Sequence, residues 1–330
     1  MADELEIRAP TPADVPALGK LYEVVKGRPR PESVTRHRLF DTPWGDSVAL
    51  IALDGDVCAS MAVFWPVAMR VGDDVVHGAQ GMEAVTHPDY RGRPRLFLTI
   101  ARQGRDLALE RGVELLYTFP NVRSIKLTKH VGATYLGEVG GWGIDLERRR
   151  IRVPGLARRR KEVAAAPPTT EELAAFAAEV HAERGVVRTD KSAAWLSWRY
   201  SDATCENYEW LALRDAAGSL TAAALLGERD PESWGPDFAG IVRILELLAQ
   251  DEEAAQSLLR LAVDHVRRGG ARKLDILVKD PVLERAVGAA GFRLEHRHPI
   301  TTRAHEARRF DVDTYDFDRW RLISGDHDFF

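Results

Sequence analysis

Three arginines alternate with a glycine and a proline in the segment HPDYRGRPRLF, residues 87–97, between a strand pattern and a helix pattern. The first turn of a helix carries unpaired N–H groups and the positive end of the helix dipole, so anions bind there. A guanidinium can hold a phosphate through two hydrogen bonds, and three are offered here, by Arg91, Arg93 and Arg95. Gly92 allows close backbone approach, while Pro94 suits a first helical turn but gives up one N–H donor. These residues alone allow both a phosphate site and a plain basic helix start.

A carboxylate lies on the strand pattern that leads into this segment. Glu83, on an alternating strand, can face a cleft, and partial burial raises the pKa of a carboxylate towards a value useful for a general base. The alternative is a surface or salt-bridged strand glutamate. Three histidines are further base candidates, although strand, turn and helix-end positions are their simpler interpretations; they are His77, His87 and His130.

The elements that position these residues follow from hydrophobic periodicity and turn residues. The expected strands of the first half are Leu5–Arg8, Val48–Leu53, Val57–Val71, Val75–Thr86 and Glu114–Phe119, with one more after Gly132. The expected helices are one beginning at Thr11, then Glu32–Leu39, Arg95–Arg111 and Ser124–Val131. This order predicts an α/β (α+β) fold with a mixed sheet and helices on both faces.

The second half repeats this plan after a change in composition. Residues 148–161, RRRIRVPGLARRRK, are basic without an acid, which is typical of a solvated linker; an acidic ligand or partner is the alternative. A capping-box spacing at Thr169–Glu172 then begins a new helix. Arg111–Gly132 and Gly269–Gly291 match in the order of glycine stop, apolar strand, Asn or Asp beside proline, and short helix. The predicted division is residues 1–147, a linker at 148–168, and residues 169–330.

Composition argues against several classes of protein. The 330 residues carry a net charge of -4, whereas a dedicated nucleic-acid binder is strongly basic. Cys58 and Cys205 fit neither a disulfide framework nor a zinc spacing. The start MADELEIRAP lacks the basic and apolar regions of a signal peptide, and no apolar run reaches the length of a membrane span. We therefore expect a cytoplasmic protein without a metal, a membrane or a nucleic acid as partner.

The segment HPDYRGRPRLF resembles the pyrophosphate loop of the GNAT N-acetyltransferases, which reads Q/R-x-x-G-x-G/A. Arg91 matches its first position, whereas Pro94 replaces the usual first glycine and Leu96 the small residue. The phrase FPNVRSIKLTKHVGATYLG, residues 119–137, is similar to a branch of the family with PN-x-x-S. The resemblance covers about residues 5–146, and it implies acetyl-CoA or another acyl-CoA as co-substrate and an amine as acceptor.

The resemblance also implies roles for single positions. The backbone of Val85 and Thr86 would meet the pantetheine arm, and Asn121 and Ser124 belong to the segment that orients it. The pyrophosphate would be held by Arg91, Gly92, Arg93 and Arg95. Thr128 stands where family members often place a tyrosine general acid, and Glu83 is the candidate base.

The second half resembles a degenerate GNAT unit, which makes two GNAT-like sheets in tandem. LELLAQDEEAAQSLL, residues 245–259, has acids and no glycine at the loop position, so it would repel an anion, and a single acyl-CoA site is predicted in the first half. WLSWRY (195–200) and RLISGDHDFF (321–330) resemble tandem acetyltransferases of polysaccharide or amino-sugar modification. The aromatic residues Trp195, Trp198 and Tyr200 are more typical of a core or domain interface than of a substrate platform.

The sequence thus predicts an acyl-CoA-dependent N-acyltransferase that acts by direct attack of a primary amine of a small molecule, such as an amino sugar. One alternative is an inactive CoA-sensing or scaffold module, favoured by Pro94, Leu96 and Thr128. Another is a Fem-like aminoacyl transferase using charged transfer RNA, favoured by residues 148–161 and opposed by the net charge. The acceptor and the oligomeric state stay open at this level.

Overall fold

The structure is a computed structural model, and it describes residues 5–121, 124–147, 167–204, 207–228, 239–305 and 310–327. The first half has its elements in the predicted order. Its strands are β1 (Glu6–Arg8), β2 (Val48–Asp54), β3 (Val57–Val71), β4 (Asp74–Thr86), β5 (Leu115–Thr118) and β6 (Thr134–Asp145). Its helices are α1 (Val15–Lys26), α2 (Glu32–Phe40), α3 (Pro94–Glu110) and α4 (Ile125–Thr128), with short 3-10 turns η1 (Pro12–Asp14), η2 (Pro88–Tyr90) and η3 (Lys129–Val131).

The second half follows the same plan with additional short elements. Its strands are β7 (Val187–Thr189), β8 (Asn207–Arg214), β9 (Leu220–Glu228), β10 (Ile241–Ala249), β11 (Lys273–Lys279), β12 (Arg293–Ala304) and β13 (Leu322–Ile323). Its helices are α5 (Thr170–Val180), α6 (Ala193–Arg199), α8 (Glu252–Arg268) and α9 (Pro281–Ala289), with turns η4 (Asp202–Thr204), η6 (Phe317–Arg319) and η7 (Ser324–Asp326). The predicted capping box is confirmed, because the Glu172 amide donates to Thr169 Oγ1 and the Thr169 amide to Glu172 Oε2, both at 3.1 Å.

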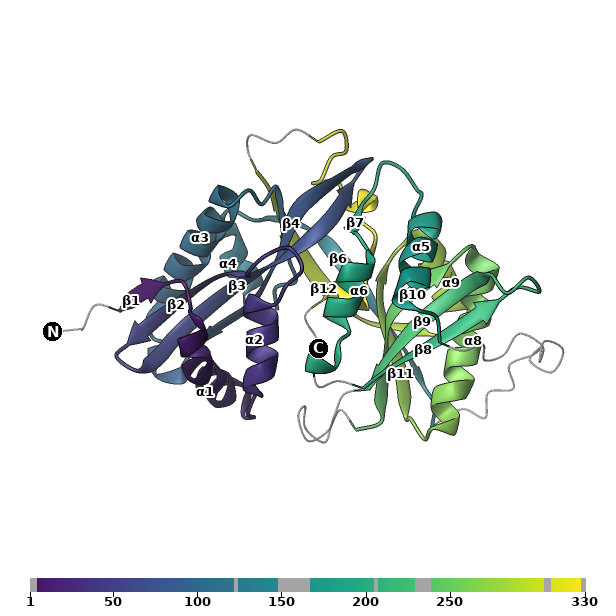
Figure 1. Cartoon of the computed structure of the whole chain (residues 1–330), viewed down its shortest axis with the longest axis horizontal. Coiled ribbons are helices and arrows are strands. Elements are labelled where there is room, and N and C mark those ends of the chain that lie inside the picture. The colour runs from purple at the N-terminus through teal and green to yellow at the C-terminus, as the bar shows by residue number, and fades with distance from the viewer. Residues whose placement is uncertain are drawn as a thin grey trace.

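The two halves share one continuous sheet, in the order β1-β2-β3-β4-β5-β12-β6-β11-β10-β9-β8 (Figure 1). The last strand of each half crosses to the other half: β12 pairs with β5, and β6 pairs with β11, both antiparallel. β6 and β12 also pair with each other along most of their length. The predicted mixed α/β architecture with two similarly ordered units is confirmed, and the exchange of β6 and β12 joins the two sheets.

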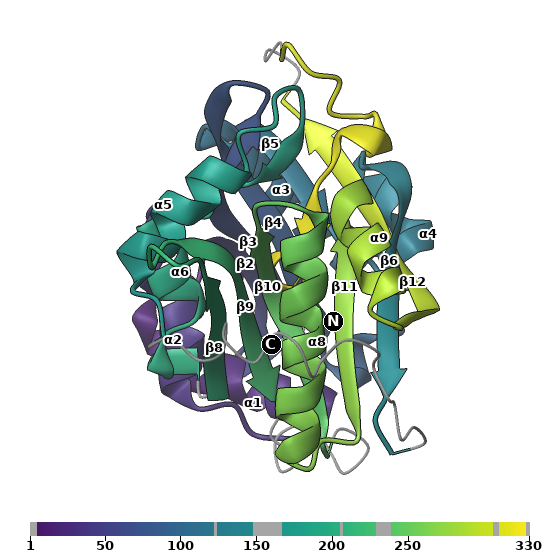
Figure 2. The same cartoon turned by 90° about the vertical axis from the view of Figure 1, so that its right-hand side faces the viewer.

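Helices cover both faces of this sheet, as period-two burial requires. Along β2, Leu50 and Ala52 pack with Leu96 and Ile100 of α3, whereas Ile51 belongs to the cluster that contains the apolar side of α1. The helices α1 and α2 therefore lie on one face of the first half, and α3 lies on the other (Figure 1). In the second half α8 and α9 cover one face of β8–β11 (Figure 2).

The largest apolar cluster joins the two halves. Trp65 and Tyr117 from the first half and Trp195 and Trp320 from the second are all buried in it. Trp198 also belongs to it, with its ring 5.4 Å from that of Trp65. The expectation that the WLSWRY segment serves a core or interface is therefore confirmed.

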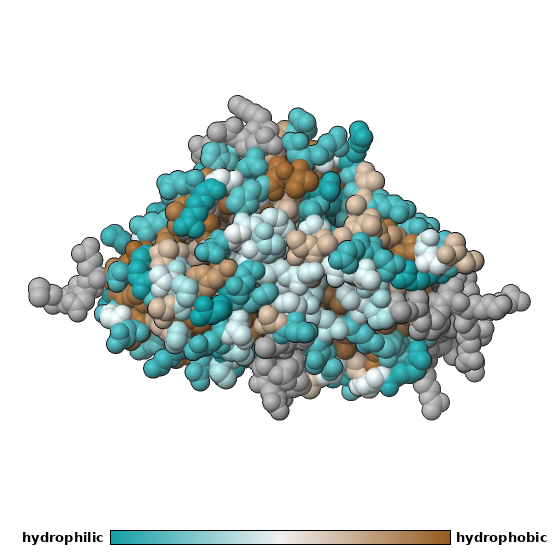
Figure 3. All heavy atoms as spheres, in the orientation of Figure 1, coloured by the Kyte–Doolittle hydropathy of each residue, from teal (hydrophilic) through white to brown (hydrophobic). Residues whose placement is uncertain are grey.

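The face of the molecule that Figure 3 shows is largely hydrophilic, and its apolar residues form small separate patches. Within the described ranges, no helix is long and apolar enough to cross a membrane. The basic segment 148–161 and Cys205 lie outside the described residues. The division into residues 1–147, 148–168 and 169–330 therefore stays a proposal.

Candidate active site

The central feature of the first half is the point where β4 and β5 part. They pair in parallel only from Gly78–Gly81 on β4 to Leu115–Thr118 on β5. Against β3, the register of β4 shifts between Met82 and Val85, which leaves an extra residue in β4 and forms a bulge. Within this bulge Glu83 has a φ of 48°, a left-handed conformation that is uncommon outside glycine. The bulge bends β4 away from β5 and leaves an opening through the sheet.

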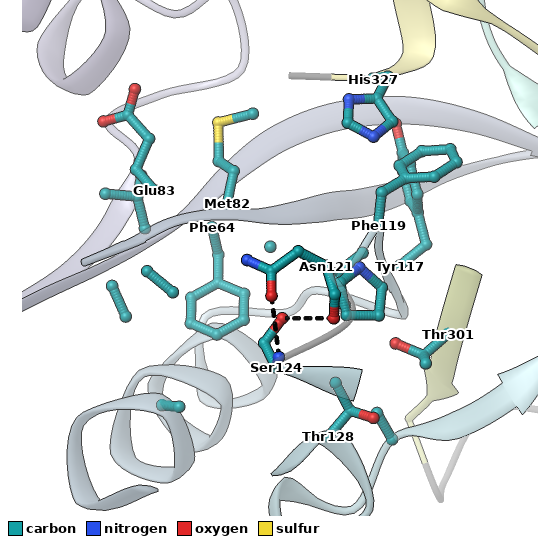
Figure 4. Close-up of a pocket in the computed structure, with 18 of the residues that line it drawn as sticks. Phe64, Met82, Glu83, Tyr117, Phe119, Asn121, Ser124, Thr128, Thr301 and His327 are labelled. Atoms are coloured by element: carbon teal, nitrogen blue, oxygen red, sulfur yellow. Dashed lines mark hydrogen bonds between the residues drawn. The ribbon is translucent and has the colours of Figure 1, made fainter. Parts of the chain in front are cut away.

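A cavity of about 800 Å³ lies in this opening, and its lining residues come from both faces of the sheet. On the α3 face it is lined by Phe97 and Ala101 of α3 and by Asn121, Ser124 and Thr128. On the α1–α2 face it is lined by Tyr22, Lys26, Arg30 and Arg38. The second half closes it with side chains that include Arg243, His296, Arg297, His298 and His327. Figure 4 shows part of this lining.

Glu83 lies in the wall of this cavity and is held by two arginines. Its Oε1 accepts from Arg30 at 2.7 Å and from Arg38 at 2.9 Å, and its Oε2 accepts from Arg30 at 2.9 Å. Burial raises the pKa of Glu83, but attraction to the two guanidinium groups outweighs it and lowers the pKa to about 2. The sequence-based expectation of a raised pKa is therefore wrong. A carboxylate this acidic is a weak base, and its side chain points away from Asn121 and Ser124 (Figure 4).

Asn121 and Ser124 form the turn that begins α4. Asn121 Oδ1 accepts from the Ser124 amide at 2.9 Å, and the Ser124 hydroxyl donates to the Asn121 carbonyl at 3.3 Å. One turn later, the Thr128 hydroxyl donates to the carbonyl of Ile125 at 2.7 Å. These three side chains therefore shape one wall of the cavity, and the Thr128 proton is engaged by the backbone.

The loop before α3 is a compact turn with its arginines outside. The amides of Arg91 and Arg93 donate to the carbonyls of Pro88 and Tyr90 within the turn. The Tyr90 hydroxyl anchors the turn by donating to Asp54 at 2.7 Å. The side chains of Arg91, Arg93 and Arg95 are exposed and are not part of the cavity lining. The positive charge of this loop therefore comes mainly from its guanidinium groups and less from backbone amides.

The three histidines considered as alternative bases do not line the cavity. His87 caps the η2 turn, because its Nδ1 accepts from the Asp89 amide at 3.3 Å. His130 lies exposed in η3, and His77 lies within β4. Their structural interpretations therefore agree with the geometry.

The equivalent opening of the second half is filled by the chain itself. β10 and β11 pair in parallel only from Ile241 to Ile244, and the β10 register against β9 shifts before Glu246, as in β4. Here β13 pairs with the end of β11, and Ser324 Oγ accepts from the Leu277 amide at 2.8 Å. The first turn of α8 is capped by the Asp251 carboxylate, which accepts from the Ala254 amide at 2.8 Å. Among its described residues, this half therefore has neither a comparable open cleft at the bulge nor a positive helix start for an anion.

A buried ion cluster ties this filling segment in place. Lys191 Nζ lies 2.8 Å from Glu246 Oε1 and 2.6 Å from Asp326 Oδ1, and all three side chains are at most 4% exposed. Burial raises the pKa of Glu246, and Lys191 only partly opposes this effect. Each half thus has a buried glutamate near its strand bulge. In the second half one lysine lies between two carboxylates, whereas in the first half two arginines bind a single carboxylate.

Histidines from the second half form a wall that the sequence did not indicate. The ring of His298 lies 4.6 Å from that of His296 and 5.5 Å from that of His327. Burial, together with the two neighbouring histidines, lowers the pKa of His298 to about 3. Gly141 of β6 makes room for this wall, because a Cβ there would overlap the His296 ring. The i, i+2 spacing of His296 and His298 was a signal for one strand face, but only the exchange of β12 brings them to the first half.

The first half thus has a mixed sheet with a bulged fourth strand, a fifth strand that parts from it, and a helix that starts just after the fourth, in the order that the GNAT resemblance predicts. Solved structures agree with this fold. A GCN5-related N-acetyltransferase from Anabaena variabilis is 13% identical, with a TM-score of 0.64 over 92% of this chain and 73% of that one. One from Kribbella flavida is 18% identical, with a TM-score of 0.58 over 92% and 73%.

A tandem GNAT protein from the clavulanic acid biosynthesis pathway shares the two-unit plan. It is 15% identical, with a TM-score of 0.61 over 93% of this chain and 100% of that one. No family model matches the chain, and no curated protein matches it by sequence. The assignment of the GNAT fold therefore rests on structural similarity, and the chain contains two such units.

Proposed function

We propose that the protein is an N-acyltransferase that moves an acyl group from acyl-CoA to a primary amine by direct attack. The carrying observation is the cavity between β4 and β5, open in the first half and filled in the second. Fold neighbours are named as N-acetyltransferases, which supports acyl transfer as the chemistry. Because the opening reaches both faces of the sheet, two substrates can enter from opposite sides.

The residues present fit an acyl-CoA on the α3 face. Beyond Gly81 β4 is not paired with β5, so the backbone around Val85 and Thr86 offers an edge to the amides of a pantetheine arm. Arg91, Arg93 and Arg95 supply the charge for a pyrophosphate at the start of α3. Bound acyl-CoA would supply a thioester carbonyl, which the amine attacks to form a C–N bond as the C–S bond breaks.

Overall one proton leaves the amine nitrogen and one reaches the sulfur. The lysine and arginine side chains in the cavity wall assist the loss of the proton from the amine. Nearby positive charge lowers the pKa of a bound ammonium group and so favours the neutral, nucleophilic amine. Glu83 and its arginines then act as positioning residues that hold the bulge, rather than as the base. Thr128 shapes the wall beside the sulfur end, while its hydroxyl stays bonded to the backbone.

Isothermal titration of the full chain with acetyl-CoA is the direct test. We expect one site per chain, with a Kd in the range of about 1 μM to 1 mM that substrates commonly show. Thiol release with a panel of primary amines then measures transfer. Absence of binding at millimolar ligand would rule the proposal out, two sites per chain would contradict the filled second opening, and binding without thiol release would favour the CoA-sensing alternative.

Arg93→Glu is expected to weaken acetyl-CoA binding by about 10- to 100-fold, because a charge-assisted hydrogen bond contributes about 1.5–3 kcal/mol. Its guanidinium is exposed and lies 5.2 Å from the Tyr90 ring, so the fold does not depend on it. Arg111→Glu makes the same charge change at the far end of α3 and is the matched control. Equal affinities for the two variants, measured by titration at low salt, would remove the loop from the binding site.

A further inference from the structure

One buried hydroxyl group in the cavity wall is not hydrogen-bonded. Thr301 of β12 lines the cavity and is 0% exposed, and its Oγ1 has no hydrogen-bond partner among the described residues. The next residue shows the usual arrangement, since the Thr302 hydroxyl donates to the Leu116 carbonyl at 2.8 Å. Buried hydroxyl groups without a partner are destabilising and rare in native proteins. A ligand in the cavity can supply the acceptor that the chain does not.

The strand register places Thr301 level with the opening. Thr301 on β12 pairs with Thr118 on β5, and Thr118 pairs with Gly81 on β4. Gly81 and Thr118 are the last pair before β4 and β5 part, so the three residues form one row across the sheet at the edge of the opening. Thr301 is therefore two strand spacings, about 9–10 Å, from β4.

This row of residues faces α3. Residues directly opposite one another on neighbouring strands lie on the same face of a sheet, and a Cβ at Gly81 would lie 3.4 Å from both the Thr118 Cβ and the Phe64 ring. Phe64 packs against α3, since a Cβ at Gly104 of that helix would lie 2.8 Å from its ring. Thr301 is therefore on the face that suits acyl-CoA, and Figure 4 shows its hydroxyl turned away from β12 towards the cavity.

The thioester sulfur is the acceptor atom that fits this position. The amine must meet the acyl carbon at the opening, so the sulfur bonded to that carbon lies at the same level. Sulfur is larger than oxygen and forms longer hydrogen bonds, so a hydroxyl recessed in the wall can still reach it. Thr128, on the same side of the cavity, is already engaged, because its hydroxyl donates to the Ile125 carbonyl at 2.7 Å.

We propose that the Thr301 hydroxyl donates a hydrogen bond to the sulfur of bound acyl-CoA. This inference rests on the proposed function and adds to it a residue of the second half, which the exchange of β12 brings into the first site. As the C–S bond breaks, its electron pair passes to sulfur, and the proton that sulfur gains is balanced by the one that leaves the amine. Thr301 keeps its own proton and stabilises the negative charge that collects on sulfur.

The test replaces this hydroxyl with a methyl group of similar size in the variant Thr301→Val. Thr189→Val is the matched control: Thr189 also lies on a strand, is 1% exposed and has a hydroxyl without a partner among the described residues, but it is outside the cavity lining. Because each change removes an unpaired buried hydroxyl, we expect both variants to unfold at or above the midpoint of the parent protein. A purely structural role for Thr301 would instead lower its midpoint.

Titration of the full chain with CoA and with desulfo-CoA, which lacks the sulfur, isolates the proposed contact. We expect Thr301→Val to weaken CoA binding by about 2- to 10-fold and to leave the affinity for desulfo-CoA unchanged. With acetyl-CoA and an accepted amine, kcat should fall by about 10- to 100-fold, because the hydrogen bond to a charged atom is the stronger one. Thr301→Ser keeps the hydroxyl and should restore both values, and Thr189→Val should change neither.

The outcomes separate this inference from the proposed function. A parent protein that binds CoA, with a Thr301→Val variant that binds it equally well, overturns the inference and leaves the function standing. An equal loss of affinity for CoA and desulfo-CoA also overturns it, because the sulfur would then not be the acceptor. A parent protein that binds neither CoA nor acetyl-CoA at millimolar ligand overturns the function, and the inference with it.

Discussion

Replacing Ala84 with tryptophan is expected to abolish acyl transfer, with a fall in kcat/KM of about a thousandfold, equivalent to about 4 kcal/mol. Ala84 lies in the β4 bulge, lines the cavity and is exposed to it. An indole at this position fills the opening through which the acyl group must meet the amine. Because the methyl group faces the cavity instead of the apolar core, the larger side chain does not disrupt the packing of the sheet.

The measurements are acetyl-CoA titration, thiol release and the thermal unfolding midpoint. Ala216→Trp is the matched control, since Ala216 is exposed in the turn between β8 and β9, far from the cavity in sequence and outside its lining. We expect both variants to unfold close to the parent protein and only Ala84→Trp to lose binding. A variant Ala84→Trp that binds acetyl-CoA with unchanged affinity would place the cofactor elsewhere.

Local signals were sufficient to predict the main elements of the first half and the repeated ones of the second, but not the short additional elements such as β7 and β13. The strand expected at Val75–Thr86 is β4, Asp74–Thr86, and the helix expected at Arg95–Arg111 is α3, Pro94–Glu110. The alternating hydrophobic pattern of a strand, the 3.6-residue pattern of a helix and the glycine that ends a helix each lie within a short segment. They can therefore be recognised in a single sequence. The repeat between the halves could be recognised for the same reason, since the same local patterns follow one another in the same order in each half.

The exchange of β6 and β12 was not predictable from such signals. The edge of β5 accepts Thr301 opposite Thr118, and the edge of β11 accepts Gly140 opposite Val278. Both edges present the same backbone donors and acceptors, and neither terminal strand has a local pattern that specifies its partner. The choice depends on the packing of the whole chain, so the histidine wall on β12 could not be linked to the first half.

Sequence reasoning selected several residues that line one cavity, but it did not give the electrostatics of that cavity. Glu83, Asn121, Ser124 and Thr128 line one cavity, as residues near two strand ends can. The pKa of Glu83 depends instead on Arg30 and Arg38, which are 53 and 45 residues away in sequence. Their convergence follows from how α1 and α2 lie on the sheet, and no motif around Glu83 announces it.

Glu83→Gln is expected to lower the free energy of unfolding by about 3–5 kcal/mol at pH 7, because it leaves two buried guanidinium groups without their carboxylate. The folded-state pKa of Glu83 is lowered from its ordinary value of 4.5 to about 2. Its stabilisation is therefore complete above the unfolded pKa and is lost as the pH falls from about 4.5 towards 2. The difference in stability between parent and variant should narrow over that interval. Glu23→Gln, an exposed position on α1, makes the same chemical change as a control.

Kinetics of this variant separate positioning from base catalysis. A positioning residue sets the bulge, so Glu83→Gln should raise KM or lower kcat while the pH profile of kcat keeps its shape. A general base would instead take its own ionisation out of that profile when it is replaced. Denaturant titration from pH 3 to pH 8, with kcat profiles on the same samples, decides between the two. A variant as stable as the parent at pH 7 would show that the Arg30–Glu83–Arg38 cluster does not hold the bulge, and a profile that loses one ionisation would restore Glu83 as the base.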